Sequence, residues 1–333
     1  MLRQNSIGAT GFYFTMILVA GSANLDFVVR ASHIPAPGET VLGRAFTTYP
    51  GGKGANQAVA SARAGGATTH MLLALGDDAY AVPVEASLRS AAVQLHTVRV
   101  AGVATGTAFI CVSDDAENAI TVAPGANIAL EPRHLPALDG FSHLLLQLET
   151  PLQTVIAYAR SARLAGVQVA LNAAPAQPLD DEFLALVDVL IVNQSELASI
   201  ANHDGTIAEC LEQIHVPFVV VTLGAHGCCA RVAGEYLMQP AFPVTPVDTT
   251  GAGDTFCGVL VAALGEGNSM GAALRRASAA AALACTRSGA QSSIPSRDAV
   301  AAFLHLQPAT TAQQFAQLRD FCGLPDNNPA PSA

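Results

Sequence analysis

The sequence predicts an α/β fold in which helices flank a central, mostly parallel β-sheet that carries a small additional sheet. Short apolar runs alternate with longer alanine-rich stretches of helical periodicity, which is the pattern of βαβ units. Two regions, 27–49 and 93–122, break this rhythm, because polar and apolar residues alternate there as in antiparallel strands. With 333 residues, of which 51% are hydrophobic, the chain can bury a large core around such a sheet.

Each short apolar run is predicted to be a buried strand, since it has four to six residues and is bounded by turn residues. The predicted strands are 17–20, 70–75, 143–148, 167–172, 189–192 and 218–222. Stretches with helical spacing of apolar residues predict helices at 55–64, 82–91, 152–165, 183–187, 207–214, 253–264, 270–287, 297–306 and 312–322. We expect one domain over 16–307, with a lid formed by 27–49 and 93–122. Residues 1–15 are predicted to be a disordered N-terminal extension, and 308–333 a tail with one short helix.

Composition excludes several classes of protein. The net charge of −10 argues against a nucleic-acid binder, which would carry a basic surface. The longest apolar stretches are too short to span a bilayer, so no membrane partner is expected. The seven cysteines are scattered, without zinc spacing, and the chain is too large to need a disulfide scaffold. A reducing, cytoplasmic location is therefore predicted.

The strongest chemical signal is the run Asp-Thr-Thr-Gly-Ala-Gly-Asp-Thr-Phe at 248–256. Small residues that enter an apolar helix present unpaired N–H groups at the positive end of the helix dipole, where they can stabilise a transferred phosphoryl group. Asp254, in the first helical turn, is placed to accept a proton from a substrate hydroxyl. The alternative interpretation is that Asp254 only caps the helix after a glycine turn.

This run resembles the signature of the ribokinase-like (PfkB) carbohydrate kinase family, and a second family signature, Gly-Gly-Lys-Gly-Ala-Asn-Gln-Ala, stands at 51–58. The resemblance covers about 16–306 and implies a three-layer fold with a β-sheet lid. It also implies that Asp254 is the catalytic base and that the N–H groups of Gly251, Ala252 and Gly253 form an anion hole. In this family the sugar binds between the lid and the main sheet, and the lids of two subunits often pair, so a homodimer is expected.

The sugar-binding residues are expected after the first strand, where Gly-Ser-Ala-Asn-Leu-Asp at 21–26 resembles the ribose-phosphorylating members of the family. Carboxylate and amide groups there can bind vicinal hydroxyls, although an Asx turn that ends the strand is a plainer interpretation. By resemblance, the substrate-binding residues are Asn24, Leu25, Asp26, Gly52, Lys53, Gly54, Ala55, Asn56, Glu149 and Asp254.

The nucleotide side follows from two further motifs. Asn193 and Glu196 match the family's N-x-x-E motif, which organises Mg²⁺ and phosphates, although a helix start with a capping box explains the pattern as well. Residues 222–227, Thr-Leu-Gly-Ala-His-Gly, resemble the loop beside the nucleotide. The expected ATP-binding residues are Asn193, Thr222, Leu223, Gly224, Ala225, His226, Gly227, Gly253, Asp254 and Ser278. Ser278 departs from the His or Asn that often contacts adenine, which puts adenine stacking there in doubt.

Residues 284–293 resemble the family's monovalent-cation loop. The alternative interpretation is that this segment is only the C-terminal end of a helix. The resemblance implies a K⁺ site with oxygens from Asp248, Thr250, Ala284, Arg287, Gly289 and Ser293.

The predicted reaction is transfer of the γ-phosphoryl group of MgATP to O5 of D-ribose. Two alternatives remain: a kinase for another furanose, such as 2-deoxyribose, a nucleoside or fructose, and a non-catalytic sugar or nucleotide sensor on the same fold. A dinucleotide-dependent dehydrogenase is disfavoured, because no G-x-G-x-x-G follows the first predicted strand.

Overall fold

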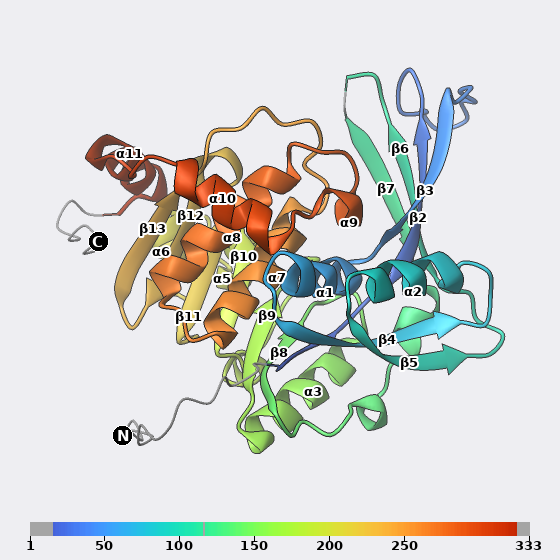
Figure 1. Ribbon diagram of the computed structural model, residues 1–333, viewed down its shortest axis with the longest axis horizontal. Coiled ribbons are helices and arrows are strands. Elements are labelled where there is room, and N and C mark those ends of the chain that lie inside the picture. Colours follow the sequence, from blue (N-terminus) through green and yellow to red (C-terminus); the bar gives the residue numbers. More distant parts are fainter. Residues whose placement is uncertain (1–15, 116, 325–333) are drawn as a thin grey trace.

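The computed structural model describes residues 16–115 and 117–324, and its centre is a nine-stranded sheet of order β13-β12-β11-β10-β9-β8-β1-β4-β5 (Figure 1). The predicted extension 1–15 and residues 325–333 of the predicted tail lie outside the described residues. Seven strands are mutually parallel: β1 (Met16–Ala20), β4 (Thr68–Gly76), β5 (Gln94–Val100), β8 (Phe141–Leu146), β9 (Gln168–Asn172), β10 (Val189–Asn193) and β11 (Phe218–Thr222). The predicted mostly parallel sheet is confirmed.

One edge of this sheet is an antiparallel hairpin that the sequence analysis did not predict. It consists of β12 (Gly227–Val232), which pairs with β11, and β13 (Glu235–Pro240). Ala233 and Gly234 form the two-residue turn with φ of 50° and 85°, the positive values that such hairpin loops require. In the sequence, this hairpin is indicated by the Ala-Gly pair between two six-residue segments, Gly227–Val232 and Glu235–Pro240.

Helices cover both faces of the sheet and form two separate cores. One face is covered by α1 (Lys53–Arg63), α2 (Ala81–Ser90), α7 (Ala252–Gly265), α8 (Met270–Ala284), α9 (Ala290–Ser293) and α10 (Arg297–Leu306). The other is covered by α3 (Leu152–Ala165), α4 (Asp181–Leu184), α5 (Gln194–Ala201), α6 (Ile207–Glu212) and α11 (Ala312–Cys322). None of the helices within the described ranges is long and apolar enough to cross a membrane.

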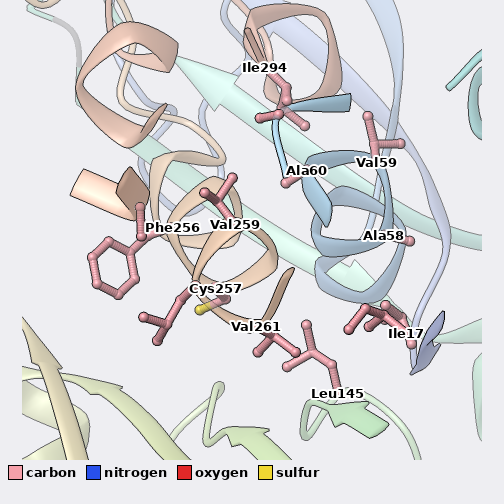
Figure 2. Close-up of a cluster of buried hydrophobic side chains, with 14 of the residues drawn as sticks. Ile17, Ala58, Val59, Ala60, Leu145, Phe256, Cys257, Val259, Val261 and Ile294 are labelled. Atoms are coloured by element: carbon pink, nitrogen blue, oxygen red, sulfur yellow. The ribbon is translucent and has the colours of Figure 1, made fainter. Parts of the chain in front are cut away.

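Alternate side chains of a buried strand belong to the two different cores. In β1, Ile17 and Val19 belong to the first core, whereas Leu18 and Ala20 belong to the second, because successive side chains of a strand point to opposite faces. Figure 2 shows the first core, where side chains of α1 and α7 meet the strands. This contact fixes α1 against α7, and both helices begin at the candidate site.

The lid is a four-stranded sheet of order β3-β2-β6-β7 that projects from the main body (Figure 1). Its strands are β2 (Asn24–Arg30), β3 (Ala45–Gly51), β6 (Gly106–Val112) and β7 (Asn118–Ala123). The assignment of all of 93–122 to the lid was wrong, since Gln94–Val100 is β5 and pairs in parallel with β4 at the edge of the main sheet. Alternation marks any half-buried strand, and therefore it does not distinguish a sheet edge from a lid.

The topology places a crevice at the carboxyl ends of the parallel strands. β1 lies between β4 and β8, so the chain leaves β1 toward the lid, returns on one side as β4, and later crosses to the other side as β8. Such a switch in strand order opens a crevice outside the sheet, and ligands of open α/β sheets bind there.

Candidate active site

Asp254 lies in the first turn of α7, and side chains from the start of α1 hold its carboxylate. Asn56 Nδ2 donates to Oδ2 and Gln57 Nε2 donates to Oδ1, both at 2.9 Å. Gly251, with φ of 73°, turns the chain into the helix. The two sequence motifs therefore meet face to face, although almost 200 residues separate them.

The charge balance around Asp254 is set by burial and by Lys53. Burial raises the pKa of Asp254, while Lys53 and the amides of Asn56 and Gln57 oppose that shift. Burial alone would lower the pKa of Lys53, but the carboxylates of Asp254, Glu149 and Glu196 raise it above the ordinary lysine value. Lys53 is therefore a stable cation among three acidic groups.

A second polar group lies at the base of the lid, where β2 leaves the main sheet. Asn24 and Asp26 are buried there, and Asn127 Nδ2 donates to Asn24 Oδ1 at 2.7 Å. Burial, followed by the charges of Glu149 and Asp254, raises the pKa of Asp26 to about 7. Oδ1 of Asp26 and Oδ1 of Asn56 accept no hydrogen bond within the described part of the chain. Buried acceptors without partners suit a ligand with several hydroxyl groups.

Close backbone packing joins this polar group to the start of α1. Gly52 has φ of 87°, and a Cβ there would lie 2.9 Å from the backbone nitrogen of Asn24, so no other residue fits. The Lys53 N–H donates to Glu149 Oε2 at 3.2 Å, and Ser22 Oγ donates to the same oxygen at 2.5 Å. Glu149 is thereby fixed beside the Gly52 turn.

Not every predicted binding residue directs its side chain to the site. Leu25 and Ala55 are buried in the first core, and Gly54 packs against the backbone of Ser22. Only backbone atoms of these three positions can face a ligand. An Asx turn, the plainer interpretation of 21–26, is not what the structure has, because Asn24 and Asp26 lie within β2.

A polar cavity of about 210 Å³ adjoins Asp254. Its lining includes Lys53, Asn172, Asn193, Glu196, Thr222, Gly251, Gly253 and Asp254. Asn193 and Glu196 form a capping box at the start of α5, as the alternative interpretation of the N-x-x-E motif required. Burial nevertheless raises the pKa of Glu196, whose side chain lines the cavity.

A larger, mostly apolar cavity of about 530 Å³ continues from the first, since Thr222 and Gly253 line both. Its lining includes Gly224, Ala225, Gly227 and Ser278. Leu223 is buried, and the His226 ring stacks on Phe321 with centroids 3.8 Å apart; neither lines this cavity. The loop 222–227 thus borders the cavity mainly through its small residues.

The six positions predicted to hold K⁺ lie on two segments that hydrogen bonds join. Asp248 accepts from the N–H groups of Thr250 and Gly289, at 2.9 and 2.8 Å. These bonds lower its pKa, although burial alone would raise it. The Cys285 carbonyl accepts from Val247 N–H, which brings the end of α8 to the same loop.

Chemically, both groups of oxygens fit the expected cations. Carbonyl oxygens, such as those of the K⁺ positions, are the ligands that replace the hydration shell of K⁺ in proteins. Mg²⁺ binds few carboxylates and retains phosphate and water ligands. Glu196 and Asp254 both line the polar cavity, and two carboxylates match that preference.

Sequence reasoning missed three positioning residues. Gln57 holds Asp254 and also donates to Asn172 Oδ1, Asn127 holds Asn24, and Ser22 holds Glu149. Gln57 belongs to the motif at 51–58 and Ser22 to the run at 21–26, so the sequence already placed both residues close to the site. Asn127 follows the lid strand β7 in a short 3₁₀ helix, and no motif marked it.

Comparison with known proteins decides the family. The pfkB family carbohydrate kinase model matches residues 15–297, which is most of the chain. The chain is a member of the pfkB carbohydrate kinase family. It is 39% identical over 300 residues to a ribokinase of Haemophilus influenzae, and the match covers 86% of this chain and 98% of that protein.

Solved structures of this family have the same fold. The crystal structure of ribokinase from Thermotoga maritima superposes with a TM-score of 0.81 at 35% identity, and the match covers 88% of this chain and all of that one. Ribokinase of Arabidopsis thaliana, complexed with ribose and ATP, gives a TM-score of 0.80 at 32% identity, with 88% and 99% covered. The predicted three-layer kinase fold is confirmed, and the dehydrogenase alternative is excluded.

Proposed function

We propose that this carbohydrate kinase transfers the γ-phosphoryl group of ATP to O5 of D-ribose, giving D-ribose 5-phosphate and ADP. The observation that carries the proposal is the convergence of Asp254 with the buried, partly unpartnered polar groups of Asn56 and Asp26. The relatives described above support it, because they are ribokinases and one of them is complexed with ribose and ATP.

In this mechanism Asp254 accepts the proton of the 5-hydroxyl as its oxygen attacks the γ-phosphorus. The N–H groups of Gly251, Ala252 and Gly253 stabilise the transferring group at the positive end of α7. The Ala252 N–H donates to the Thr249 carbonyl at 3.2 Å, a long bond that it can exchange for a phosphoryl oxygen. A Cβ at Gly253 would meet no atom within 4 Å, so this position faces open space.

The sugar is held by Asn24, Asp26, Asn56 and Glu149, which lie around Asp254 at the base of the lid. Leu25, Gly52, Lys53, Gly54 and Ala55 shape this binding site through their backbone, and Lys53 adds a positive charge. Correct positioning supplies much of the rate, because phosphoryl transfer needs little covalent chemistry from the protein.

The nucleotide binds across the two joined cavities, in contact with Asn193, Gly253, Ser278 and the loop residues Thr222, Gly224, Ala225 and Gly227. Mg²⁺, when bound, neutralises the charge that develops on the phosphates. Glu196 at the polar cavity would hold it, partly through water. The oxygens for K⁺ would come from Asp248, Thr250, Ala284, Arg287, Gly289 and Ser293. The hydrogen bonds of Asp248 keep the two segments that carry these residues together.

We also propose a homodimer formed through the lid and a reducing, cytoplasmic location. Phe46 and Phe109 on one face of the lid are 62% and 54% exposed, and Ile120 and Val122 on the opposite face are 56% and 45% exposed. Exposed apolar side chains of this kind favour pairing. All seven cysteines are free, as a reducing compartment requires. Light scattering of the purified protein should give twice the chain mass; a monomer at micromolar concentration would contradict the dimer.

The product distinguishes this proposal from its alternatives. Incubation with ribose and MgATP, followed by phosphorus NMR, should give the signal of a 5-phosphate coupled to two methylene protons. A 1-phosphate, which couples to a single proton, would contradict the assignment of O5. Absence of any sugar phosphate from folded protein that binds ribose would favour the non-catalytic sensor.

A further inference from the structure

Helix α11 lies beyond residue 297, where the family match ends, and it packs on the β12–β13 hairpin (Figure 1). Leu318 and Cys322 are buried in the same core as Cys229 of β12 and Met238 of β13. On its outer side, Phe321 stacks on His226 with an interplanar angle of 17°. The helix is therefore fixed against the loop that borders the larger cavity.

One side chain of α11, Gln314, lines that cavity. Its Oε1 accepts from the N–H of Thr311 at 2.9 Å and from Thr311 Oγ1 at 3.1 Å, as the third residue of a capping box. These two hydrogen bonds fix the orientation of the Gln314 carboxamide. Its Nε2 group donates to no acceptor within residues 16–115 and 117–324, so both of its hydrogens are available at the cavity.

The other hydroxyl side chains that line this cavity are those of Thr222, Thr249 and Ser278. Thr222 Oγ1 donates to the Val192 carbonyl at 3.4 Å, and Ser278 Oγ pairs with Cys228 Sγ at 3.5 Å. The remaining lining includes Phe242, Pro243, Val244 and Ala281, which are apolar. A mostly apolar cavity with a carboxamide donor held at its wall suits a flat aromatic base with an acceptor nitrogen at its edge.

We propose that Gln314 is a base-specificity residue, whose Nε2 donates to a ring nitrogen of adenine, and that α11 forms a wall of the nucleotide site. This inference rests on the proposed function, because it places the nucleoside of ATP in the larger cavity. Gln314 acts on nucleotide affinity and not on sugar affinity, since ribose and Asp254 lie at the other end of the joined cavities.

The variant that tests the proposal is Gln314→Glu. Glutamate is a preferred third residue of a capping box, so the bond to Thr311 and the helix are retained while the donor is replaced by an acceptor. Gln313→Glu is the matched control, since it makes the same chemical change one residue away on an exposed position. Binding of ADP is measured by titration calorimetry, together with the melting temperature and the KM for ribose.

We expect the Kd for ADP to rise roughly 3- to 10-fold in Gln314→Glu, which is the scale of one lost hydrogen bond. The melting temperature, the KM for ribose and the Kd of Gln313→Glu should stay at wild-type values. Among 1-deaza, 3-deaza and 7-deaza analogues of ADP, the one that lacks the contacted nitrogen should lose affinity for the wild type but not for Gln314→Glu.

An unchanged Kd in Gln314→Glu, or an equal loss in Gln313→Glu, would overturn the inference. Wild-type protein that binds ADP but does not phosphorylate ribose would contradict the proposed function and leave the calorimetric test intact. Wild-type protein that does not bind ADP would overturn both.

Discussion

Replacing Asp254 by asparagine removes the proposed base and changes little else. The new side chain has the same shape, but one carboxylate oxygen becomes an NH₂ group. Both oxygens accept amide donors, Asn56 Nδ2 and Gln57 Nε2, so in the variant one of these donors faces another donor. The cost of that lost bond is about 1 kcal/mol.

Burial of the charge opposes this cost. Because the pKa of Asp254 is raised in the folded protein, its ionised form destabilises the fold at every pH above the unfolded value of 3.8. Asparagine carries no charge and removes that penalty. The two effects offset each other, and the melting temperature should stay within about 4 °C of the wild type, the shift that roughly 1 kcal/mol produces in a domain of this size.

Turnover should fall much further than stability. Loss of a general base lowers kcat by roughly 10²- to 10⁴-fold, or about 3–5 kcal/mol of activation free energy. The assay is ribose-dependent ADP release with saturating MgATP, and Asp181→Asn, an exposed aspartate at the start of α4, is the control. A folded Asp254→Asn protein with kcat within fivefold of the wild type would refute the role of Asp254.

Three further changes test the sugar and cation sites. Because Asp26 has a pKa of about 7, its ionised form, which accepts hydrogen bonds from the sugar, is lost as pH falls, and the KM for ribose should rise below pH 7. Asp26→Asn should abolish this pH dependence of KM. A wild-type KM that is flat from pH 6 to 8 would argue against the role of Asp26 in sugar binding. Asn127→Ala removes the hydrogen bond to Asn24 and leaves the Ala23 N–H unpaired. The KM for ribose should rise about 10-fold, and urea denaturation should show that the free energy of unfolding falls by about 1–3 kcal/mol. An unchanged KM would contradict the positioning role of Asn127. Asp248→Asn loosens the bonds to Thr250 and Gly289, and half-maximal activation should need about 10-fold more K⁺; the same K⁺ curve as the wild type would count against the cation loop.

Local patterns predicted much of the fold, because buried parallel strands are short apolar runs and their crossover helices are amphipathic. The pattern could not assign Gln94–Val100 to the main sheet, since an edge strand and a lid strand share the same alternation. It also missed β12 and β13, where few β-branched residues occur and the Ala233–Gly234 turn was the main signal.

Residues of the candidate site were predictable where they belong to compact motifs. Asp254 and Asn56 stand in such runs, and the structure brings them to 2.9 Å. Asn127 and Gln314 were not predictable, because each reaches the site through tertiary packing of a segment without a motif. The position of α11 depends on its contact with a hairpin that the sequence analysis had not predicted.

Phosphorylation of ribose is best tested by measuring kcat/KM for ADP release with MgATP across ribose, 2-deoxyribose, fructose and nucleosides, each with K⁺ or with Na⁺ alone. We expect ribose to have the highest kcat/KM and K⁺ to raise it. A higher kcat/KM for another sugar would contradict the ribose assignment, and no turnover on any of them by folded protein would contradict the kinase mechanism built on Asp254.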